Sequence, residues 1–123
     1  IIHNFYFLKQ CLSKHTNKLI LPEATPNANP SWFGFLITVK KDAGITRNEL
    51  IQKLDAKKIA TRLLFAGDLR KQPYFKDYDY RIVGDLPNTD IIVSDTFWIG
   101  VTPMLNDEML EYMISSFDEI LGE

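Results

Sequence analysis

The chain has 123 residues, of which 46% are hydrophobic and 24% are charged, and its formal net charge at pH 7 is −2. These values are typical of one folded globular domain, and they exclude an intrinsically disordered chain. The charge is too small for a basic nucleic-acid-binding face, and no apolar run approaches the roughly 20 residues that span a bilayer. The single cysteine, Cys11, excludes an internal disulfide and any all-cysteine iron–sulfur or zinc site within the chain. We therefore expect a cytoplasmic domain with no nucleic acid partner and no membrane attachment.

The first residues predict a helix that has no visible start. Ile1, Phe5, Leu8 and Leu12 follow helical spacing, and no Ser, Thr, Asp or Asn precedes them as an N-cap. We interpret this helix as continuing from preceding chain, so that residues 1–123 form a single domain of a longer protein. The alternative is a complete small protein from which a leader or tag has been removed.

Three strands are expected in the remainder of the chain. Residues 31–39, 59–65 and 97–101 are rich in aromatic and β-branched side chains, whereas residues 19–22 are assigned to the end of the first helical region. Helical patterns alternate with the three strands, with one helix before them and one after. This order predicts an α/β (α+β) fold, in which a small, mostly antiparallel sheet of about three strands is covered by about four helices.

Polar residues mark the starts of the later helices. Thr46 and Glu49 have the spacing of a capping box, in which each side chain bonds the backbone N–H of the other residue. Asn88 or Thr89 is expected to cap a short helix, and Asn106 is expected to cap the last one. The acidic residues of that last helix have no Lys or Arg among them and are interpreted as a solvated face.

Few residues suit metal binding or nucleophilic catalysis. His3, Cys11 and His15 are the only strong nitrogen or sulfur ligands, and no convincing fourth ligand accompanies them. We therefore expect a partly buried cysteine and surface histidines. The sequence has no G-x-S-x-G motif and no glycine-rich phosphate loop, so no catalytic residue is assigned.

The segment 62–81 is the more informative candidate. Five cations stand there against three acids, interleaved with Tyr74, Phe75, Tyr78 and Tyr80. This long loop could hold a phosphate and stack against a base or sugar, or it could be a surface loop whose rings pack on the domain. Arg62 lies in an otherwise apolar strand, so its guanidinium needs either an internal acid or an anionic ligand.

The remaining aromatic residues of interest fall in the predicted strands. For these five side chains core packing is expected, although some could face a neighbouring domain. They are Trp32, Phe33, Phe35, Phe97 and Trp98.

Five segments carry a resemblance to a known family. They are PSWFGFLITV (30–39), TRNELIQKL (46–54), IATRLLFAGDLRKQPYF (59–75), YRIVGDLPNTD (80–90) and DTFWIGVTPML (95–105). Together they resemble the C-terminal part of the CDP-4-keto-6-deoxyglucose 3-dehydrases of lipopolysaccharide O-antigen synthesis. These enzymes belong to the DegT/DnrJ/EryC1/StrS sugar aminotransferase family, which has the pyridoxal-phosphate (PLP) fold type I.

The resemblance implies that residues 1–123 are the small C-terminal domain of a larger enzyme, whose N-terminal domain binds the cofactor. That enzyme would use pyridoxamine phosphate (PMP) or PLP and a 2Fe–2S cluster, and this chain alone would bind no cofactor or metal. It would act as a homodimer on CDP-4-keto-6-deoxyglucose, with a flavin and iron–sulfur reductase as its electron donor. The product would be a 3-deoxy sugar nucleotide, and the isolated chain would be inactive.

The resemblance also places residues of this chain along one side of the active-site cleft. They are Thr61, Arg62, Leu64, Phe65, Gly67, Arg70 and Tyr74. Arg62 would contact the anionic substrate or a facing acid, and Phe65 would exclude water from the reaction. Family members often carry Asn where this chain has Asp68.

Two other functions are compatible with the sequence. One is the small domain of a PLP-dependent sugar aminotransferase, although such relatives carry a histidine in the stretch where this chain has apolar residues 64–66. The other is a free-standing module that binds a small ligand or a protein through the segment 62–81.

Overall fold

Four short strands form one sheet in the computed structural model, which describes residues 1–122. They are β1 (Leu19–Ile20), β2 (Phe35–Val39), β3 (Thr61–Leu63) and β4 (Thr96–Ile99). Their spatial order is β1-β2-β4-β3, and every neighbouring pair is antiparallel, as predicted. The sheet has one strand more than expected because residues 19–20, which we assigned to a helical region, pair with residues 38–39.

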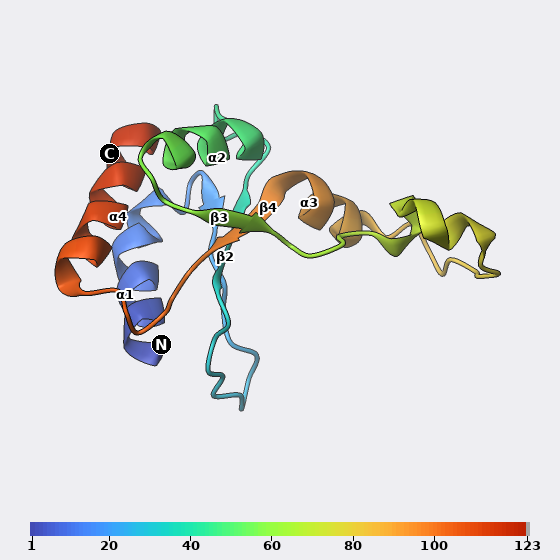
Figure 1. Cartoon of the computed structure of the whole chain (residues 1–123), viewed down its shortest axis with the longest axis horizontal. Coiled ribbons are helices and arrows are strands. Elements are labelled where there is room, and N and C mark those ends of the chain that lie inside the picture. The colour runs from blue at the N-terminus through green and yellow to red at the C-terminus, as the bar shows by residue number, and fades with distance from the viewer. Residues whose placement is uncertain (123) are drawn as a thin grey trace.

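The four expected helices are present within residues 1–122. They are α1 (Ile2–Leu12), α2 (Arg47–Ala56), α3 (Pro87–Asp95) and α4 (Asp107–Leu121). Figure 1 shows α1 and α4 side by side on one side of the sheet, with α2 beside them and α3 leading directly into β4. The predicted α/β (α+β) class, a small antiparallel sheet covered by helices, is therefore confirmed.

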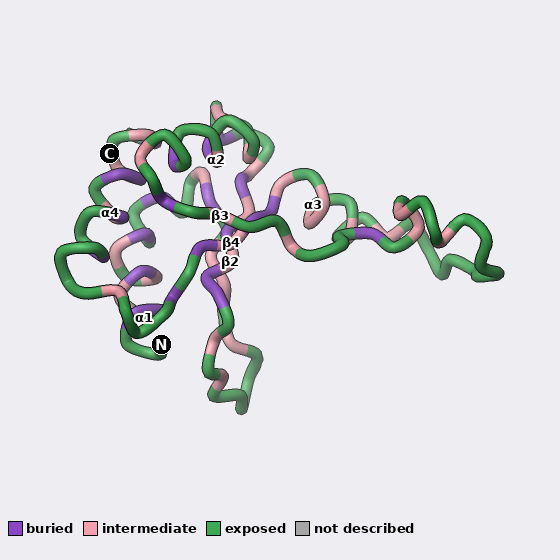
Figure 2. Tube along the Cα trace, viewed as in Figure 1, coloured by how far each residue is buried: buried purple, intermediate pink, exposed green. Residues whose placement is uncertain are grey.

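The hydrophobic core lies between one face of the sheet and the helices α1, α2 and α4 (Figure 2). In β2, Phe35 and Ile37 are buried and pair in register with the buried Ile99 and Phe97 of β4. Side chains alternate along a strand, so Trp98 lies on the opposite face, where it is only half-buried. The helical core residues are Phe5, Leu8, Leu12, Leu50, Leu54, Leu110, Met113, Phe117 and Leu121.

Two of the predicted helix caps are confirmed. The backbone N–H of Glu49 donates to Thr46 Oγ1 at 3.1 Å, and the Thr46 N–H donates to Glu49 Oε1 at 3.0 Å. This bond from the Thr46 backbone holds the pKa of Glu49 below its ordinary value. At the start of α4, the Met109 N–H donates to Asn106 Oδ1 at 2.9 Å. Both helices therefore start where the local sequence predicts.

The predicted cap of α3 is wrong. This helix begins at Pro87, and neither Asn88 nor Thr89 precedes it as an N-cap. The residue in the cap position is Leu86, whose φ of 52° is left-handed and whose side chain makes no capping bond. Proline is favoured in the first turn of a helix because it has no N–H to satisfy, and here it sets the start.

An ion cluster, in which only His15 is buried, joins the segment after α1 to α4 and corrects two expectations. His15, expected at the surface, is only 2% exposed, and its Nε2 lies 2.7 Å from Asp118 Oδ1. Lys14 Nζ donates to the other oxygen of Asp118 at 2.6 Å. Asp118 is therefore not part of a purely solvated acidic face. Burial raises its pKa, but the bonds from Lys14 and His15 outweigh burial and hold the pKa below its ordinary value.

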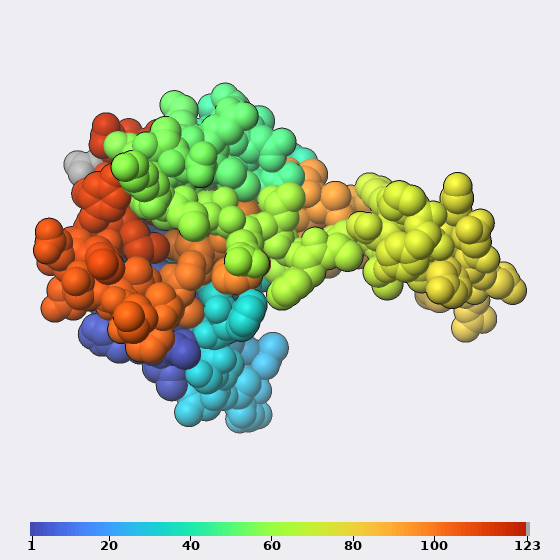
Figure 3. All heavy atoms as spheres, viewed as in Figure 1, coloured from blue at the N-terminus to red at the C-terminus, as the bar shows by residue number. Residues whose placement is uncertain are grey.

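The segment between β3 and α3 projects from the body of the molecule (Figures 1 and 3). We call residues 66–86 the arm. It contains the long loop expected from the sequence and two short 3-10 turns, η2 (Leu69–Lys71) and η3 (Pro73–Asp77). Asp68 is the one buried residue of the arm, and no residue from position 69 to 95 is buried.

Candidate functional site

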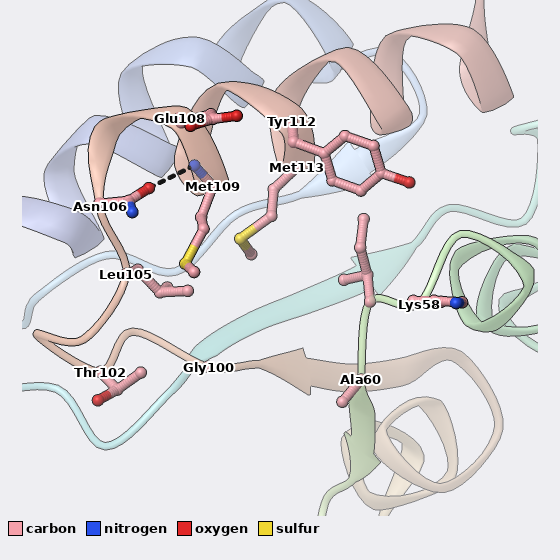
Figure 4. A pocket seen from close by; sticks show the side chains of 11 residues that line it. Lys58, Ala60, Gly100, Thr102, Leu105, Asn106, Glu108, Met109, Tyr112 and Met113 are labelled. Carbon is pink, nitrogen blue, oxygen red and sulfur yellow. Dashed lines mark hydrogen bonds between the residues drawn. The ribbon is translucent and has the colours of Figure 1, made fainter.

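A cavity of about 600 Å³ lies between α4 and the ends of β3 and β4 (Figure 4). Its walls include Ile59, Leu105, Met109 and Met113, and the Asn106 side chain beside it caps α4. None of the seven cleft residues expected from the sequence lines this cavity. It is therefore not the predicted site.

A second hollow, of about 410 Å³, lies where β3 ends and the arm begins. We call it the aromatic groove, and its walls are Phe33, Arg62, Leu63, Phe65 and Trp98. These residues come from three separated parts of the chain, which the pairing of β3 with β4 and the start of β2 bring together. Two of the seven residues expected from the sequence, Arg62 and Phe65, belong to it.

The Arg62 guanidinium lies over the indole of Trp98. The two residues are register partners in β3 and β4, and Arg62 Cζ is 6.0 Å from the centre of the indole ring. Within residues 1–122, no acidic side chain pairs with Arg62. The internal acid considered from the sequence is therefore not found in the part of the chain that the structure describes, and the exposed guanidinium can bind an anion.

Phe33, Leu63 and Trp98 also line the groove, although they are not among the seven cleft residues expected from the sequence. The clearest case is Phe33. We placed it in a buried strand, but β2 begins only at Phe35, and Phe33 is 75% exposed. Its ring lies 6.3 Å from the Phe65 ring and 5.1 Å from the Trp98 ring, measured between centroids. The available signal was Gly34, because a Cβ at that position would overlap the Trp98 ring. This close approach ends the regular alternation just before β2.

The backbone turns sharply at Phe65 and directs its ring into the groove. Phe65 has a left-handed φ of 51°, which costs about 1–2 kcal/mol for a residue with a side chain. Bonds from the Phe65 N–H to Leu63 O at 2.8 Å and from the Gly67 N–H to Leu64 O at 3.0 Å close the turn. Gly67 has a φ of 70°, and a Cβ there would lie 3.0 Å from Val93 Cγ2. The TRLLFAG motif thus forms a strand end followed by a tight turn.

Arg70 pairs with Asp68 at the base of the arm and does not line the groove. Its Nε and Nη2 donate to Asp68 Oδ1 and Oδ2 at 3.0 and 2.6 Å, and its backbone N–H also donates to Oδ1 at 3.0 Å. The Arg70 side chain holds the pKa of Asp68 below its ordinary value, and Asp68 raises that of Arg70. Arg70 is therefore already paired with an acid, and its role in the cleft stays a prediction about the longer protein.

The other expected cleft residues do not line the groove. Thr61 is half-buried in β3 and pairs with Ile99, and Leu64 is half-buried after the strand. Tyr74 lies in η3, where its ring contacts those of Phe75 and Tyr78 at 6.2 and 6.4 Å between centroids. A cleft role for these residues stays a prediction about the longer protein.

The walls of the groove carry one charged side chain and are otherwise apolar or aromatic. The groove has no lysine, histidine or carboxylate among its walls, and Arg62 is its one charged group. Residues 1–122 hold no cluster of three or more His, Cys, Asp or Glu residues that could bind a metal ion. No helix in this described part is long and apolar enough to cross a membrane.

Comparisons with known proteins show which family the chain belongs to. A sequence model of the DegT/DnrJ/EryC1/StrS aminotransferase family matches residues 3–118. The lipopolysaccharide biosynthesis protein RfbH of Salmonella typhimurium is 55% identical over 119 residues, which cover 97% of this chain and 27% of that protein. The dTDP-4-dehydro-2,6-dideoxy-D-glucose 3-dehydratase of Saccharopolyspora spinosa is 46% identical over 105 residues, 85% of this chain and 23% of that enzyme. The chain thus spans about a quarter of the length of these relatives.

A solved structure supports the fold. The Escherichia coli GDP-4-keto-6-deoxy-D-mannose-3-dehydratase with bound hydrated PLP superposes with a TM-score of 0.82 and 23% identity. The match covers 93% of this chain and 29% of that enzyme. At this identity the likeness concerns the fold alone. It shows that the arrangement of the sheet and helices occurs as one part of a longer enzyme.

Proposed function

Because the chain belongs to the DegT/DnrJ/EryC1/StrS aminotransferase family, we propose that residues 1–123 are the C-terminal small domain of a sugar-nucleotide 3-dehydratase. The relatives that support this proposal include a 3-dehydratase acting on a dTDP-sugar and a lipopolysaccharide biosynthesis protein. Since the chain spans only about a quarter of their length, the activity belongs to the longer protein and this chain contributes one wall of its site.

The observation that carries the proposal is the composition of the aromatic groove. Three aromatic rings and one exposed guanidinium face the same hollow, with no acid or base for proton transfer among its walls. Arg62 binds the negative charge of the sugar nucleotide, and Phe65 with Phe33 keeps water away from the reacting sugar. An apolar wall suits an elimination better than transamination, for which family members carry a histidine in this stretch.

The finer features implied by the resemblance belong to the same proposal. The substrate is CDP-4-keto-6-deoxyglucose, and the product is a 3-deoxy sugar nucleotide used for lipopolysaccharide O-antigen in the cytoplasm. Pyridoxamine phosphate, or PLP, and a 2Fe–2S cluster supply the elimination and electron-transfer chemistry from the rest of the enzyme. The enzyme acts as a homodimer, and its electron donor is a flavin and iron–sulfur reductase. This chain's own groove offers neither the lysine nor the thiolates that would anchor these groups.

Substitutions in the full-length enzyme test the roles of Arg62 and Phe65. We expect Arg62→Ala to lower kcat/KM for the sugar nucleotide about 10- to 100-fold, the usual value of a charge-assisted hydrogen bond. Arg62→Lys should recover part of this loss, and Phe65→Ala should lower kcat. Lys53→Ala, at an exposed position of α2, is the matched control. Unchanged dehydration kinetics in both Arg62→Ala and Phe65→Ala would remove these roles.

The substrate class and reaction type can be tested together. The full-length enzyme is incubated with CDP-, dTDP- and GDP-linked 4-keto-6-deoxy sugars, and the products are identified by mass spectrometry. A 3-deoxy product supports the dehydratase, whereas an amino sugar formed with an amino donor supports the aminotransferase alternative. The nucleotide with the highest kcat/KM identifies the substrate.

A binding experiment with the chain itself tests the third alternative. Residues 1–123 are titrated with a CDP-sugar and with pyridoxamine phosphate by calorimetry. We expect no binding, because the groove is one wall of a cleft that the rest of the enzyme completes. Clear binding of either compound would favour a free-standing ligand-binding module.

A further inference from the structure

Three strands place one side chain each in a row on the face of the sheet that is turned away from the core. Leu36 of β2 and Arg62 of β3 are both register partners of Trp98 in β4. Residues directly opposite each other in antiparallel strands project from the same face, so Trp98 stands between Leu36 and Arg62. Its neighbours along β4, Phe97 and Ile99, are buried in the core on the other face. The Arg62 side chain therefore leaves the sheet beside an aromatic ring.

The indole of Trp98 is the one electrostatic partner of the Arg62 guanidinium within residues 1–122. The guanidinium carbon lies 6.0 Å from the centre of the ring, and no acidic side chain of this part of the chain pairs with it. An arginine side chain has many rotamers, and the entropy lost when an anion fixes them reduces the affinity for that anion. A ring that already favours one position of the guanidinium lowers this entropic loss.

The indole is itself held in place by packing. A Cβ at Gly34 would overlap Trp98 Cε3, so the backbone at position 34 lies directly against the ring. The Phe33 ring lies 5.1 Å from the Trp98 ring between centroids and is tilted by 51° to it. Trp98 Nε1 is buried and has no hydrogen-bond partner among the described residues, so packing alone orients the ring and the N–H does not face a ligand in the groove. What Trp98 offers to the groove is its ring.

We propose that Trp98 is a positioning residue for Arg62, whose guanidinium it holds at the aromatic groove in readiness for an anion. The inference rests on the proposed function, in which Arg62 binds the negative charge of the sugar nucleotide. Among aromatic side chains tryptophan attracts a cation most strongly. A guanidinium on the face of a ring keeps its N–H donors for the oxygen atoms of a phosphate, which it can bind in bidentate fashion. A leucine at position 98 would fill part of the same volume without the negative ring face.

A double-mutant cycle in the full-length enzyme tests the proposal. Calorimetry measures the dissociation constants of CDP, dTDP and GDP, and the nucleotide that binds most tightly is used for the variants. We expect Trp98→Leu to raise this dissociation constant about 3- to 10-fold, in keeping with the strength of a cation–π contact at a partly exposed site. Trp98→Phe retains a ring and should stay within twofold of the unmodified enzyme. In the Arg62→Ala background Trp98→Leu should change the constant by less than twofold, because no guanidinium remains to be positioned.

The matched control is Leu36→Ala, which removes the register partner of Trp98 on the side away from Arg62 and should leave the dissociation constant within twofold. Thermal unfolding shows whether each variant is folded. If Trp98→Leu does not fold, Gly34→Ala, which displaces the indole without removing it, takes its place in the cycle.

Three outcomes would overturn the proposal. They are an unchanged dissociation constant in Trp98→Leu, an equal effect of this substitution with and without Arg62, and the absence of nucleotide binding that depends on Arg62. The second outcome would mean that Trp98 acts on the ligand or on the fold directly. The cycle does not use dehydration activity, so an enzyme that dehydrates a sugar nucleotide but shows no coupling between Trp98 and Arg62 would contradict this inference and leave the proposed function intact.

Discussion

At Phe65 the backbone conformation and the position of the side chain favour different residue types. Its left-handed φ favours glycine, while its ring completes one wall of the aromatic groove beside Phe33. Strained backbone at a ligand-facing position is common where the surrounding structure fixes the geometry. Here the bonds that close the turn after Leu63 supply that constraint.

Two substitutions at this position should therefore differ in stability but not in function. We expect Phe65→Gly to be about 1 kcal/mol more stable than Phe65→Ala, because glycine adopts positive φ without steric cost. Both variants lose the ring, so their dehydration kinetics in the full-length enzyme should be equally impaired. Urea unfolding and steady-state kinetics measure the two effects. Equal stabilities would show that the backbone at position 65 is not strained.

At the scale of elements, the ion cluster around Asp118 links the segment after α1 to α4. The pKa of Asp118 is held below its ordinary value in the folded state, so its ionised form stabilises the fold. This contribution is fully present above the unfolded pKa of about 3.9 and is lost as the pH falls through the lower folded value.

Asp118→Asn should lower the free energy of unfolding at neutral pH, and the difference from the unmodified chain should shrink below about pH 4. The matched control is Glu119→Gln, which removes a surface ion pair with Lys57. That pair is exposed, so its loss should have little effect at any pH. Urea unfolding at a series of pH values measures both. A difference that is constant down to pH 2 would contradict the assignment.

Local signals predicted the elements better than the contacts between them. The Thr46–Glu49 box and the Asn106 cap depend on residues three positions apart, so the sequence contains the whole signal. By contrast, β1 is a two-residue strand that exists only through its pairing with β2. The bond between His15 and Asp118 joins residues 103 positions apart, and nothing local to either residue indicates it.

The aromatic groove was predictable only in part, again because contacts between distant segments leave no local signal in the sequence. Arg62 and Phe65 were identified through a motif and do line the groove. Phe33 was missed because the predicted strand extended to residue 31, whereas the contact between Gly34 and Trp98 separates Phe33 from β2. The engagement of Arg70 by the buried Asp68 depends on side-chain conformation, which residue types and spacing alone do not determine.

At the scale of the whole molecule, the arm packs independently of the rest of the described chain, which we call the body. All the residues of the core cluster belong to the body. Replacing residues 73–84 with a short Gly-Ser linker retains Asp68 and Arg70 and should change the free energy of unfolding of the chain by no more than about 0.5 kcal/mol. Urea unfolding followed by tryptophan fluorescence reports this, since both tryptophans lie outside the replaced segment. A large destabilisation would show that the arm contributes to the core.

The contact between Gly34 and Trp98 has a consequence for how this domain can diverge. Since the indole occupies the space that a Cβ at position 34 would need, the two positions share one volume. A larger residue at position 34 is compatible only with a smaller ring or an aliphatic side chain at position 98. Among related sequences, these positions should therefore vary together rather than independently. This correlated variation would link the chain before β2 to the middle of β4, two segments separated by about half the length of the domain.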